Sequence, residues 1–356
     1  MRLMHFISAP AAGGAEVYVK DLCKAMAMQG HDVHLVFLSR AAEINRDPSF
    51  EEYYLSELDL LGVSYSFMPA VSRRKLIRSG FHLRKIVKGF APDIIHCHLY
   101  YALWFSFFVC GVPVVYTHHN IVLKVPSVAY RIFDRKVSAY VGISLACASL
   151  LRSVSGKLVQ RIDNSIDFDR VLPVALRKKI NPSVVMIGSL CEQKNYSLFL
   201  NALALLKDLQ FSVYIAGEGA FRKTLLRQVH DLGLDSKVTF LGNISNVKEL
   251  LASADVFAMS SSWEGLPISL LEATAAGLPS IVTNVGSCSE VVHSCQSGIV
   301  VDDCSPQVYA EALRSLIESY DSRCFYGENA NRYSKKYNIK HSAVRHLSLY
   351  QHLMQH

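Results

Sequence analysis

Two glutamates and a proline lie in a short segment whose spacing suits a ligand that carries both hydroxyl groups and negative charge. The segment reads Trp263-Glu264-Gly265-Leu266-Pro267-Ile268-Ser269-Leu270-Leu271-Glu272. Pro267 suits the first turn of a helix, because its φ is already helical and its missing N–H wastes no hydrogen bond there. Glu264 is then expected in a loop and Glu272 one to two turns into the helix. The amides near Ile268 to Leu270 would bind an anion such as a pyrophosphate, while carboxylates accept hydrogen bonds from hydroxyls. The alternative is one loop glutamate and one helix-surface glutamate without a ligand.

Two further segments offer groups that could bind phosphate. Residues 187–195 end a strand-like run and open a helix, and Lys194 in this segment is a compact cation that can reach phosphate oxygens. Gly13 and Gly14 lie at the first strand-to-helix turn, where the lack of side chains lets a ligand approach the backbone. Neither segment has the glycine pattern of a dinucleotide or ATP loop. A surface lysine and an ordinary turn are the alternatives.

Apolar strand-like runs alternate with amphipathic helices, which predicts an α/β fold with doubly wound, largely parallel sheets. The runs of the first series are 3–8, 32–38, 94–98, 114–117, 139–143 and 157–159, and those of the second are 183–188, 212–216, 237–241, 256–260, 279–283 and 298–301. Residues 167–182, with two prolines and the basic residues Arg170, Arg177, Lys178 and Lys179, are predicted to link the two series.

The two series predict two Rossmann-like domains, residues 1–168 and 169–335, that face each other across a cleft. In this architecture ligands bind outside the carboxyl ends of the strands. Residues 336–356 are expected to form a C-terminal helix, for which a return to the first domain is one option.

The composition excludes several classes of protein. Of the 356 residues, 51% are hydrophobic and 19% charged, which suits packed cores and excludes wholesale disorder. The net charge of +7 suits a phosphate-bearing ligand or an anionic membrane, but it is too small to indicate nucleic acid, and no nucleic-acid partner is expected. The nine cysteines include no C-x-x-C pair and favour reduced thiols in the cytosol. His96-Cys97-His98 is the best candidate for a metal site, although buried strand residues are the favoured interpretation.

Three segments bear on membranes and targeting. The first ten residues do not form a secretory signal, so a cytoplasmic location is expected. Residues 99–117 carry no charge, but Gly111-Val112-Pro113 divides them into a helix and a strand rather than a span. Between Arg73 and Lys88, seven basic residues accompany an apolar stripe. This helix either lies against anionic lipid, as a peripheral contact with the inner face of the membrane, or covers the sheet with an ordinary solvated face.

The ordered set of motifs resembles retaining glycosyltransferase family 4, which has the GT-B fold. Glu264 and Glu272, with seven residues between them, match the E-x7-E motif of that family. Further matching segments are 13–16, 92–98, 117–120, 164–167, 188–195, 216–219 and 240–242. The resemblance implies a hexosyltransferase that moves a sugar from a nucleotide-diphosphate donor, preferably a UDP-sugar, to a glycan or lipid-linked acceptor. It further implies a part in making cell-surface polysaccharide, such as capsule, O-antigen or lipopolysaccharide.

The resemblance also implies roles for individual residues. Glu272 would hold the ribose hydroxyls of the donor, and Glu264 would hydrogen-bond the transferred sugar. Lys194 would neutralise the pyrophosphate. His119, or less directly the neighbouring His118, matches the histidine that faces the donor sugar. The implied catalytic residues are His119, Lys194 and Glu264, and the implied donor-binding residues are Gly13, Gly14, Ser189, Lys194, Gly242, Leu266, Pro267, Ile268, Ser269, Leu270 and Glu272.

Two positions depart from the family pattern. Ser189 stands where an arginine is usual, which leaves less positive charge for the leaving diphosphate, and Ser165 replaces a glycine. The resemblance implies transfer without a cofactor or metal, with attack on the face from which the diphosphate leaves, and no Asp-x-Asp motif is placed to hold an ion. A nucleotide-sugar 2-epimerase and a non-catalytic nucleotide-sugar-binding protein are the alternative functions.

Overall fold

The computed structural model describes residues 1–70, 72–175, 178–244 and 246–355. The chain divides into two compact units. Unit 1 comprises Met1–Ser165 and Ile339–His356, and unit 2 comprises Ile166–Asn338. The unit boundaries therefore fall at 165/166 and 338/339, where the sequence placed domain boundaries at 168/169 and 335/336.

Unit 1 is built on a seven-stranded parallel sheet, which confirms the predicted fold class. Its strands are β1 (Arg2–Ile7), β2 (Asp32–Phe37), β3 (Ser64–Phe67), β4 (Ile94–Cys97), β5 (Val114–His118), β6 (Val137–Gly142) and β7 (Leu158–Arg161). Their order is β3-β2-β1-β4-β5-β6-β7, so the direction of winding reverses between β1 and β4. Loops that leave β1 and β4 therefore diverge at the point where α/β sheets bind ligands. The sequence missed β3, a short edge strand with half-buried side chains.

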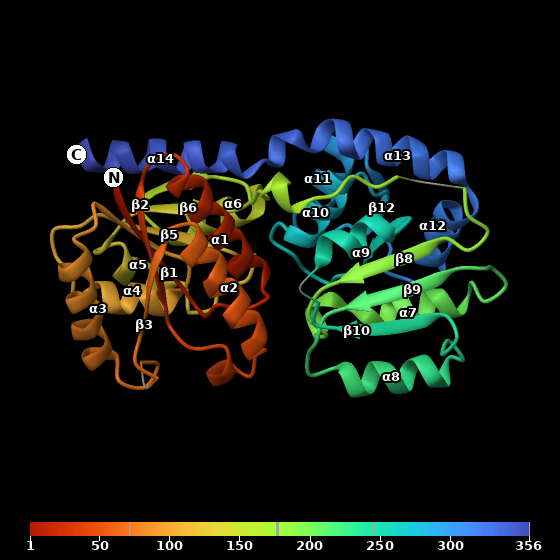
Figure 1. The fold of residues 1–356 in the computed structure, drawn as a ribbon, viewed down its shortest axis with the longest axis horizontal. Coiled ribbons are helices and arrows are strands. Elements are labelled where there is room, and N and C mark those ends of the chain that lie inside the picture. Colours follow the sequence, from red (N-terminus) through yellow and green to blue (C-terminus); the bar gives the residue numbers. More distant parts are fainter. Residues whose placement is uncertain (71, 176–177, 245, 356) are drawn as a thin grey trace. The chain divides into compact units, whose positions relative to one another are not determined.

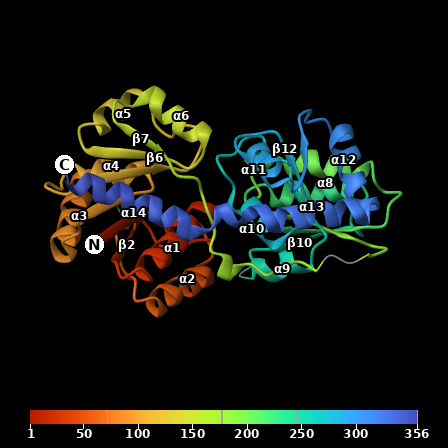
Figure 2. The same cartoon turned by 90° about the horizontal axis from the view of Figure 1, so that it is seen from above.

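Helices cover both faces of the sheet in unit 1. They are α1 (Gly14–Ala27), α2 (Pro48–Leu60), α3 (Leu76–Phe90), α4 (Tyr100–Ser106), α5 (Val128–Phe133), α6 (Leu145–Val154) and α14 (Ile339–Gln355), with the 3-10 turn η1 (Ala42–Ile44). On one face, Phe6 of β1 and Cys97 of β4 share a hydrophobic core with Leu83 of α3 and Leu103 of α4. On the other face α14 packs against α1 (Figures 1 and 2).

Unit 2 repeats the design with a six-stranded parallel sheet. Its strands are β8 (Ser183–Ile187), β9 (Ser212–Ala216), β10 (Val238–Gly242), β11 (Val256–Met259), β12 (Ser280–Thr283) and β13 (Gly298–Val301), in the order β10-β9-β8-β11-β12-β13. The helices are α7 (Tyr196–Ala204), α8 (Arg222–Asp231), α9 (Val247–Ser253), α10 (Ile268–Ala276), α11 (Cys288–Cys295), α12 (Pro306–Glu318) and α13 (Tyr320–Tyr333), with the turns η2 (Phe168–Arg170), η3 (Glu192–Lys194) and η4 (Ser334–Tyr337). The winding reverses between β8 and β11, which makes the loops after these strands the expected ligand-binding loops.

The segment predicted as a linker lies within unit 2. Arg170 pairs with the carboxylate of Glu272, and the Val174 amide donates to the Ala276 carbonyl over 2.7 Å. Arg177, one of its basic residues, lies outside the described residues. Arg170 and Val174 of this segment therefore contact α10, within unit 2.

Two other expectations concern membrane contact. The uncharged stretch 99–117 forms α4 and β5 with a turn between them, and no helix among the described residues is long and apolar enough to span a bilayer. The basic helix begins at Leu76, so Arg73, Arg74 and Lys75 precede it rather than lie in it.

Candidate functional site

Lys194 and Glu264 meet at the point where the winding of unit 2 reverses. Lys194 is the last residue of η3, in the loop after β8, and Glu264 lies in the loop after the adjacent strand β11. The Lys194 Nζ is 2.6 Å from Glu264 Oε1, and the Glu264 side chain is only 6% exposed. Because an ammonium group has three N–H donors, Lys194 can keep this contact and still donate to an anion.

The carboxylate of Glu264 is held by two neighbours that sequence reasoning missed. Ser261 Oγ donates to Glu264 Oε1 over 2.8 Å, and Gln193 Nε2 donates to Glu264 Oε2 over 3.2 Å. Gln193 Nε2 also reaches the Trp263 carbonyl at 3.0 Å, and the Ser262 amide donates to the Gln193 carbonyl at 2.8 Å. These bonds join the two loops, so the carboxylate is oriented before a ligand arrives, which is the condition for electrostatic preorganisation.

Gly286, in the loop after β12, lies against the backbone of Glu264. Its φ is +55°, in the left-handed region that favours glycine, and a Cβ at this position would overlap the Glu264 carbonyl oxygen. The next amide, that of Ser287, donates to the Gly265 carbonyl over 3.1 Å. A third loop therefore supports the Glu264 loop, and only glycine fits at the point of closest approach.

Helix α10 begins at Ile268, and Pro267 occupies the N-cap position rather than the first turn where the sequence placed it. Proline has no side-chain acceptor, so it cannot cap the helix in the way that serine or aspartate does. The first amides of a helix have no partner within the helix. Those of Ile268, Ser269 and Leu270, together with the helix dipole, are suited to an anion.

Glu272 lies in the second turn of α10 and is buried, with 7% of its surface exposed. Its Oε1 is 2.9 Å from Arg170 Nη1. Sequence reasoning missed this partner because it assigned Arg170 to a linker. A carboxylate has two acceptor oxygens, so Glu272 can keep its contact with Arg170 and still accept hydrogen bonds from ligand hydroxyls.

The other predicted donor-binding residues of unit 2 lie at the same edge of its sheet. Ser189 is half-buried in the loop after β8. Gly242 ends β10 with a φ of +70°, and its carbonyl accepts a 2.8 Å hydrogen bond from the Gly217 amide. Leu266 is buried just before α10. Unit 2 thus gathers Lys194, Glu264 and Glu272 on loops and a helix that follow neighbouring strands.

The remaining predicted site residues belong to unit 1. Gly13 is the N-cap of α1, and Gly14 is the first residue of that helix and is exposed. His119 follows β5, and its Nε2 is 3.0 Å from His98 Nδ1. Burial lowers the pKa of His119 to about 3, so the ring is neutral at pH 7. His118 lies within β5 and contacts Tyr116 OH through its Nδ1, at 3.2 Å.

Comparison with protein families agrees with this fold. The model described as Glycosyltransferase Family 4 matches residues 12–170, and the model described as Glycosyl transferases group 1 matches residues 169–333. Two Rossmann-like units with parallel sheets are the architecture of a GT-B glycosyltransferase. The chain belongs to glycosyltransferase family 4 and has the GT-B fold.

Three relatives illustrate the similarity. The chain is 27% identical to the putative glycosyltransferase EpsF of Bacillus subtilis over 80% of this chain and 79% of that protein. It is 28% identical to the O-antigen biosynthesis glycosyltransferase WbnH of Escherichia coli over 50% of this chain and 49% of that protein. The crystal structure of Anabaena HepE in complex with UDP and glucose shares the fold, with a TM-score of 0.82 and 19% identity over 98% of this chain and 99% of that one.

Proposed function

We propose that this glycosyltransferase binds a UDP-sugar in unit 2 and transfers the sugar, with retention of anomeric configuration, to a glycan or lipid-linked acceptor. The proposal includes transfer without a metal ion or other cofactor, and a role in making a cell-surface polysaccharide. Its main support is the Lys194–Glu264 pair, which is joined at 2.6 Å at the point where the sheet winding reverses and in which Glu264 is buried.

The chemistry of these side chains fits a nucleotide-diphosphate sugar. A diphosphate requires positive charge and N–H donors, which Lys194 and the first turn of α10 offer. The two ends of the ligand carry hydroxyls, which suit the carboxylates of Glu264 and Glu272. Uridine is favoured as the nucleoside because HepE, which has the same fold, has been crystallised with UDP and glucose.

The proposed reaction needs no protein nucleophile. The acceptor hydroxyl attacks the anomeric carbon on the face from which the diphosphate departs, while the bond from that carbon to the phosphate oxygen breaks. The hydroxyl proton passes to the departing phosphate oxygen. Lys194 and the amides of Ile268 to Leu270 stabilise the charge that develops on the diphosphate, a contribution that does not require a bound metal.

The exposed surface of α3 supports a membrane-borne acceptor. Ile77 and Phe81 are 68% and 58% exposed, and Arg78 and Lys85 are exposed on the same helix. Apolar side chains beside basic ones favour binding to an anionic lipid surface. We therefore propose that unit 1 meets a lipid-linked acceptor at the inner face of the membrane, which agrees with the O-antigen role in the name of the relative WbnH.

A screen of nucleotide sugars without acceptor tests the donor part of the proposal. Glycosyltransferases transfer sugar slowly to water, so the release of UDP should identify the donor. We expect release by the wild-type protein in the presence of EDTA, its loss in Lys194→Ala, and no change in Lys223→Ala, which removes an exposed lysine from α8. Release of an epimerised nucleotide sugar, or wild-type activity in Lys194→Ala, would contradict the proposal.

A further inference from the structure

Glu272 is the only ionisable residue in the sequence of α10, and it lies in an otherwise mostly apolar helix. Eight of the nine residues of α10 are buried, Glu272 among them, so its carboxylate needs a polar partner inside unit 2. Side chains of a helix tilt toward its N terminus, which directs this carboxylate toward the first turn of α10 and the loop after β11. The Glu272 side chain is 9% exposed, so it is not sealed from solvent.

The partner is Arg170, whose backbone is fixed by the turn η2. The Asp167 carboxylate accepts a 3.0 Å hydrogen bond from the Asp169 amide, and the Asp167 carbonyl accepts one of the same length from the Arg170 amide. The Arg170 Nη1 lies 2.9 Å from Glu272 Oε1, and the Arg170 side chain is 25% exposed. The pair therefore lies at the boundary between the interior of unit 2 and its surface.

A second contact holds the same segment along α10. The Val174 amide donates to the Ala276 carbonyl over 2.7 Å. Ala276 is four residues after Glu272, and residues four apart lie on one face of a helix. The carbonyls of the last turn have no partner within a helix, so this bond satisfies one of them. The segment thus meets one face of α10 at two points, which keeps Arg170 in place beside Glu272.

The ion pair prepares Glu272 for a ligand with adjacent hydroxyls. A glutamate side chain loses rotational freedom when it binds a ligand, and this loss weakens binding. Arg170 restricts the carboxylate before the ligand arrives, because the planar guanidinium donates in a fixed direction. A carboxylate has about four acceptor positions on its two oxygens, so the contact with Arg170 is compatible with hydrogen bonds from the two neighbouring hydroxyls of a ribose.

We infer that Arg170 is a positioning residue, which holds Glu272 for the ribose of the nucleotide and thereby makes the protein select ribonucleotides over 2′-deoxyribonucleotides. The inference rests on the proposed function, which places the donor in unit 2. It adds a determinant of specificity outside the loops after β8 and β11, on the segment that the sequence predicted to be a linker.

An ion pair that only stabilised unit 2 would act differently. Its loss would weaken all ligands of the site by the same factor, and so would the loss of a positive charge near a diphosphate. The ratio of two affinities cancels both effects, because UDP and its 2′-deoxy analogue dUDP carry the same diphosphate and base and differ in one hydroxyl. The preference for UDP over dUDP therefore reports on the contact with the 2′-hydroxyl.

Isothermal titration calorimetry with UDP and with dUDP measures this preference without a sugar or an acceptor. We expect the wild-type protein to bind UDP about 10- to 100-fold more tightly, which is the effect of one hydrogen bond to a charged group. Arg170→Met should lower this ratio several-fold. Arg170→Lys keeps the charge on a more flexible side chain, so its ratio should be intermediate.

Two further variants separate positioning from stability. Lys179→Met removes the cation beside Asp255, a carboxylate of unit 2 that is 1% exposed, and should lower the Tm without changing the ratio. Glu272→Gln should itself lower the ratio. If Arg170 acts through Glu272, adding Arg170→Met to Glu272→Gln should lower the ratio no further, because residues that act as one unit are not additive.

The outcomes distinguish this inference from the proposed function. Equal binding of UDP and dUDP by the wild-type protein, or an undiminished preference in Arg170→Met, would overturn the inference while the donor site stands. A further fall of the ratio in the double variant would do the same. If Arg170→Met does not fold, an undiminished preference in Arg170→Lys is the overturning result. A wild-type protein that binds neither nucleotide would overturn the proposed function, and the inference with it.

Discussion

Glu264 and Glu272 carry the specificity of the proposed donor site, and each already has a cationic partner. Lys194 neutralises Glu264 and Arg170 neutralises Glu272, so two buried carboxylates can coexist in one unit without large repulsion. The two pairs differ in role. Lys194 is placed to meet charge that grows on a diphosphate, whereas Glu272 is placed to accept hydrogen bonds from hydroxyls that are the same before and during reaction.

This difference predicts different kinetic effects. Lys194→Ala should lower kcat by about 100- to 1,000-fold, the usual effect of losing a group that stabilises transition-state charge. Glu272→Ala should instead raise the KM for the donor by about 10-fold or more, because a hydrogen bond to a charged group contributes about 1.5–3 kcal/mol. Steady-state assays measure both, with Glu249→Ala, an exposed residue of α9, as the control. Equal effects of the two variants on kcat alone would contradict these roles.

Gly286 offers a test of how the Glu264 loop is supported. Gly286→Ala should destabilise unit 2 by about 1–2 kcal/mol through its positive φ, and further through overlap with the Glu264 carbonyl oxygen. Gly233→Ala is the matched control, since its φ is +61° but the nearest atom to a new Cβ is Lys207 Nζ at 3.4 Å. Thermal unfolding should show a larger loss for Gly286→Ala, and equal losses would mean that the close contact is unimportant.

At the scale of elements, the order of strands could not be read from the sequence. The apolar runs predicted the strands well except β3, where only Tyr65 and Phe67 are large and apolar. The sequence also placed Lys194 and Glu264 after strands. It could not show that these strands are neighbours, because β8 and β11 are separated by two other strands along the chain. The contact of Gln193 with Glu264 depends on that adjacency, and the contact of Gly286 depends on the adjacency of β11 and β12, so neither could be predicted.

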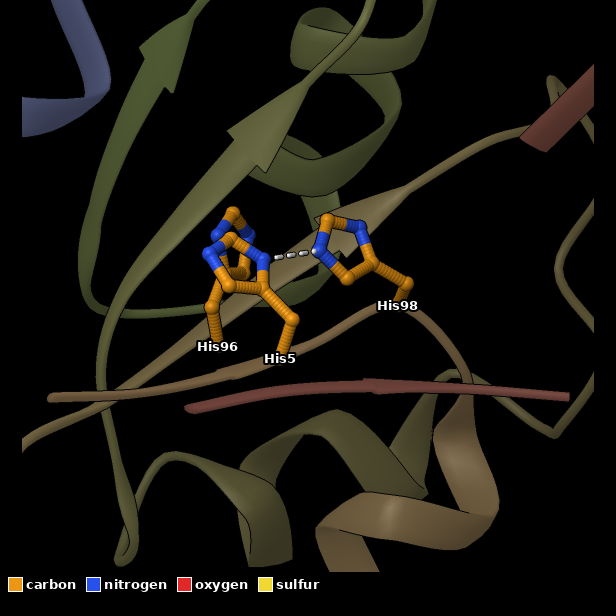
Figure 3. Close-up of side chains that lie close together, drawn as sticks. All are labelled: His5, His96 and His98. Carbon is orange, nitrogen blue, oxygen red and sulfur yellow. Dashed lines mark hydrogen bonds between the residues drawn. The ribbon is translucent and has the colours of Figure 1, made fainter. Parts of the chain in front are cut away.

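The contacts among His5, His96 and His98 (Figure 3) could not be predicted from the sequence either. His96 and His98 stood out as a pair with a spacing of two, but the register that pairs His5 with His96 joins segments about 90 residues apart. The partner of His119 could be found only once β4 and β5 were known to be adjacent.

The surface of α3 predicts lipid binding that depends on charge and on apolar contact. Replacing Arg73, Arg74 and Lys75 with glutamine, or Ile77 and Phe81 with serine, should each reduce co-sedimentation with vesicles that contain anionic lipid. The variant without the three basic residues should bind vesicles more weakly than the wild type at low salt. At high salt the two should bind alike, because screening weakens charge attraction. Neutralising the exposed Lys207, Lys223 and Arg227 of unit 2 removes the same charge elsewhere and should have little effect. Unchanged binding in both variants, the one in α3 and the one in the basic residues before it, would exclude this surface.

At the scale of the whole molecule, the two units should differ in their response to acid. His5, His119 and His346 have pKa values lowered to about 3 by burial, and His118 to about 4, and all four lie in unit 1. In the unfolded chain these four histidines bind protons near pH 6.5, whereas in the folded unit they stay neutral at that pH. Their contribution to the stability of unit 1 is therefore complete above pH 6.5 and is lost as the pH falls from 6.5 toward 3.

The two tryptophans allow the loss of stability at low pH to be measured in each unit separately. Trp104 is in unit 1 and Trp263 in unit 2, so Trp263→Phe and Trp104→Phe each leave one reporter. Each fully buried histidine ring should lower the free energy of unfolding of unit 1 by about 1.4 kcal/mol for every pH unit below 6.5. Denaturant unfolding, monitored by the fluorescence of Trp104, should show this decline in the stability of unit 1 between pH 7 and pH 5. The fluorescence of Trp263 should report a smaller decline for unit 2. Equal declines in both units would contradict the assignment.

The most direct test of the central claim is a crystal structure of the protein soaked with the nucleotide sugar that it hydrolyses. We expect the ribose hydroxyls within hydrogen-bonding distance of Glu272, the diphosphate against Lys194 and the amides of Ile268 to Leu270, and a hydroxyl of the sugar near Glu264. A nucleotide sugar bound elsewhere, with no contact to Glu264 or Glu272, would contradict the account.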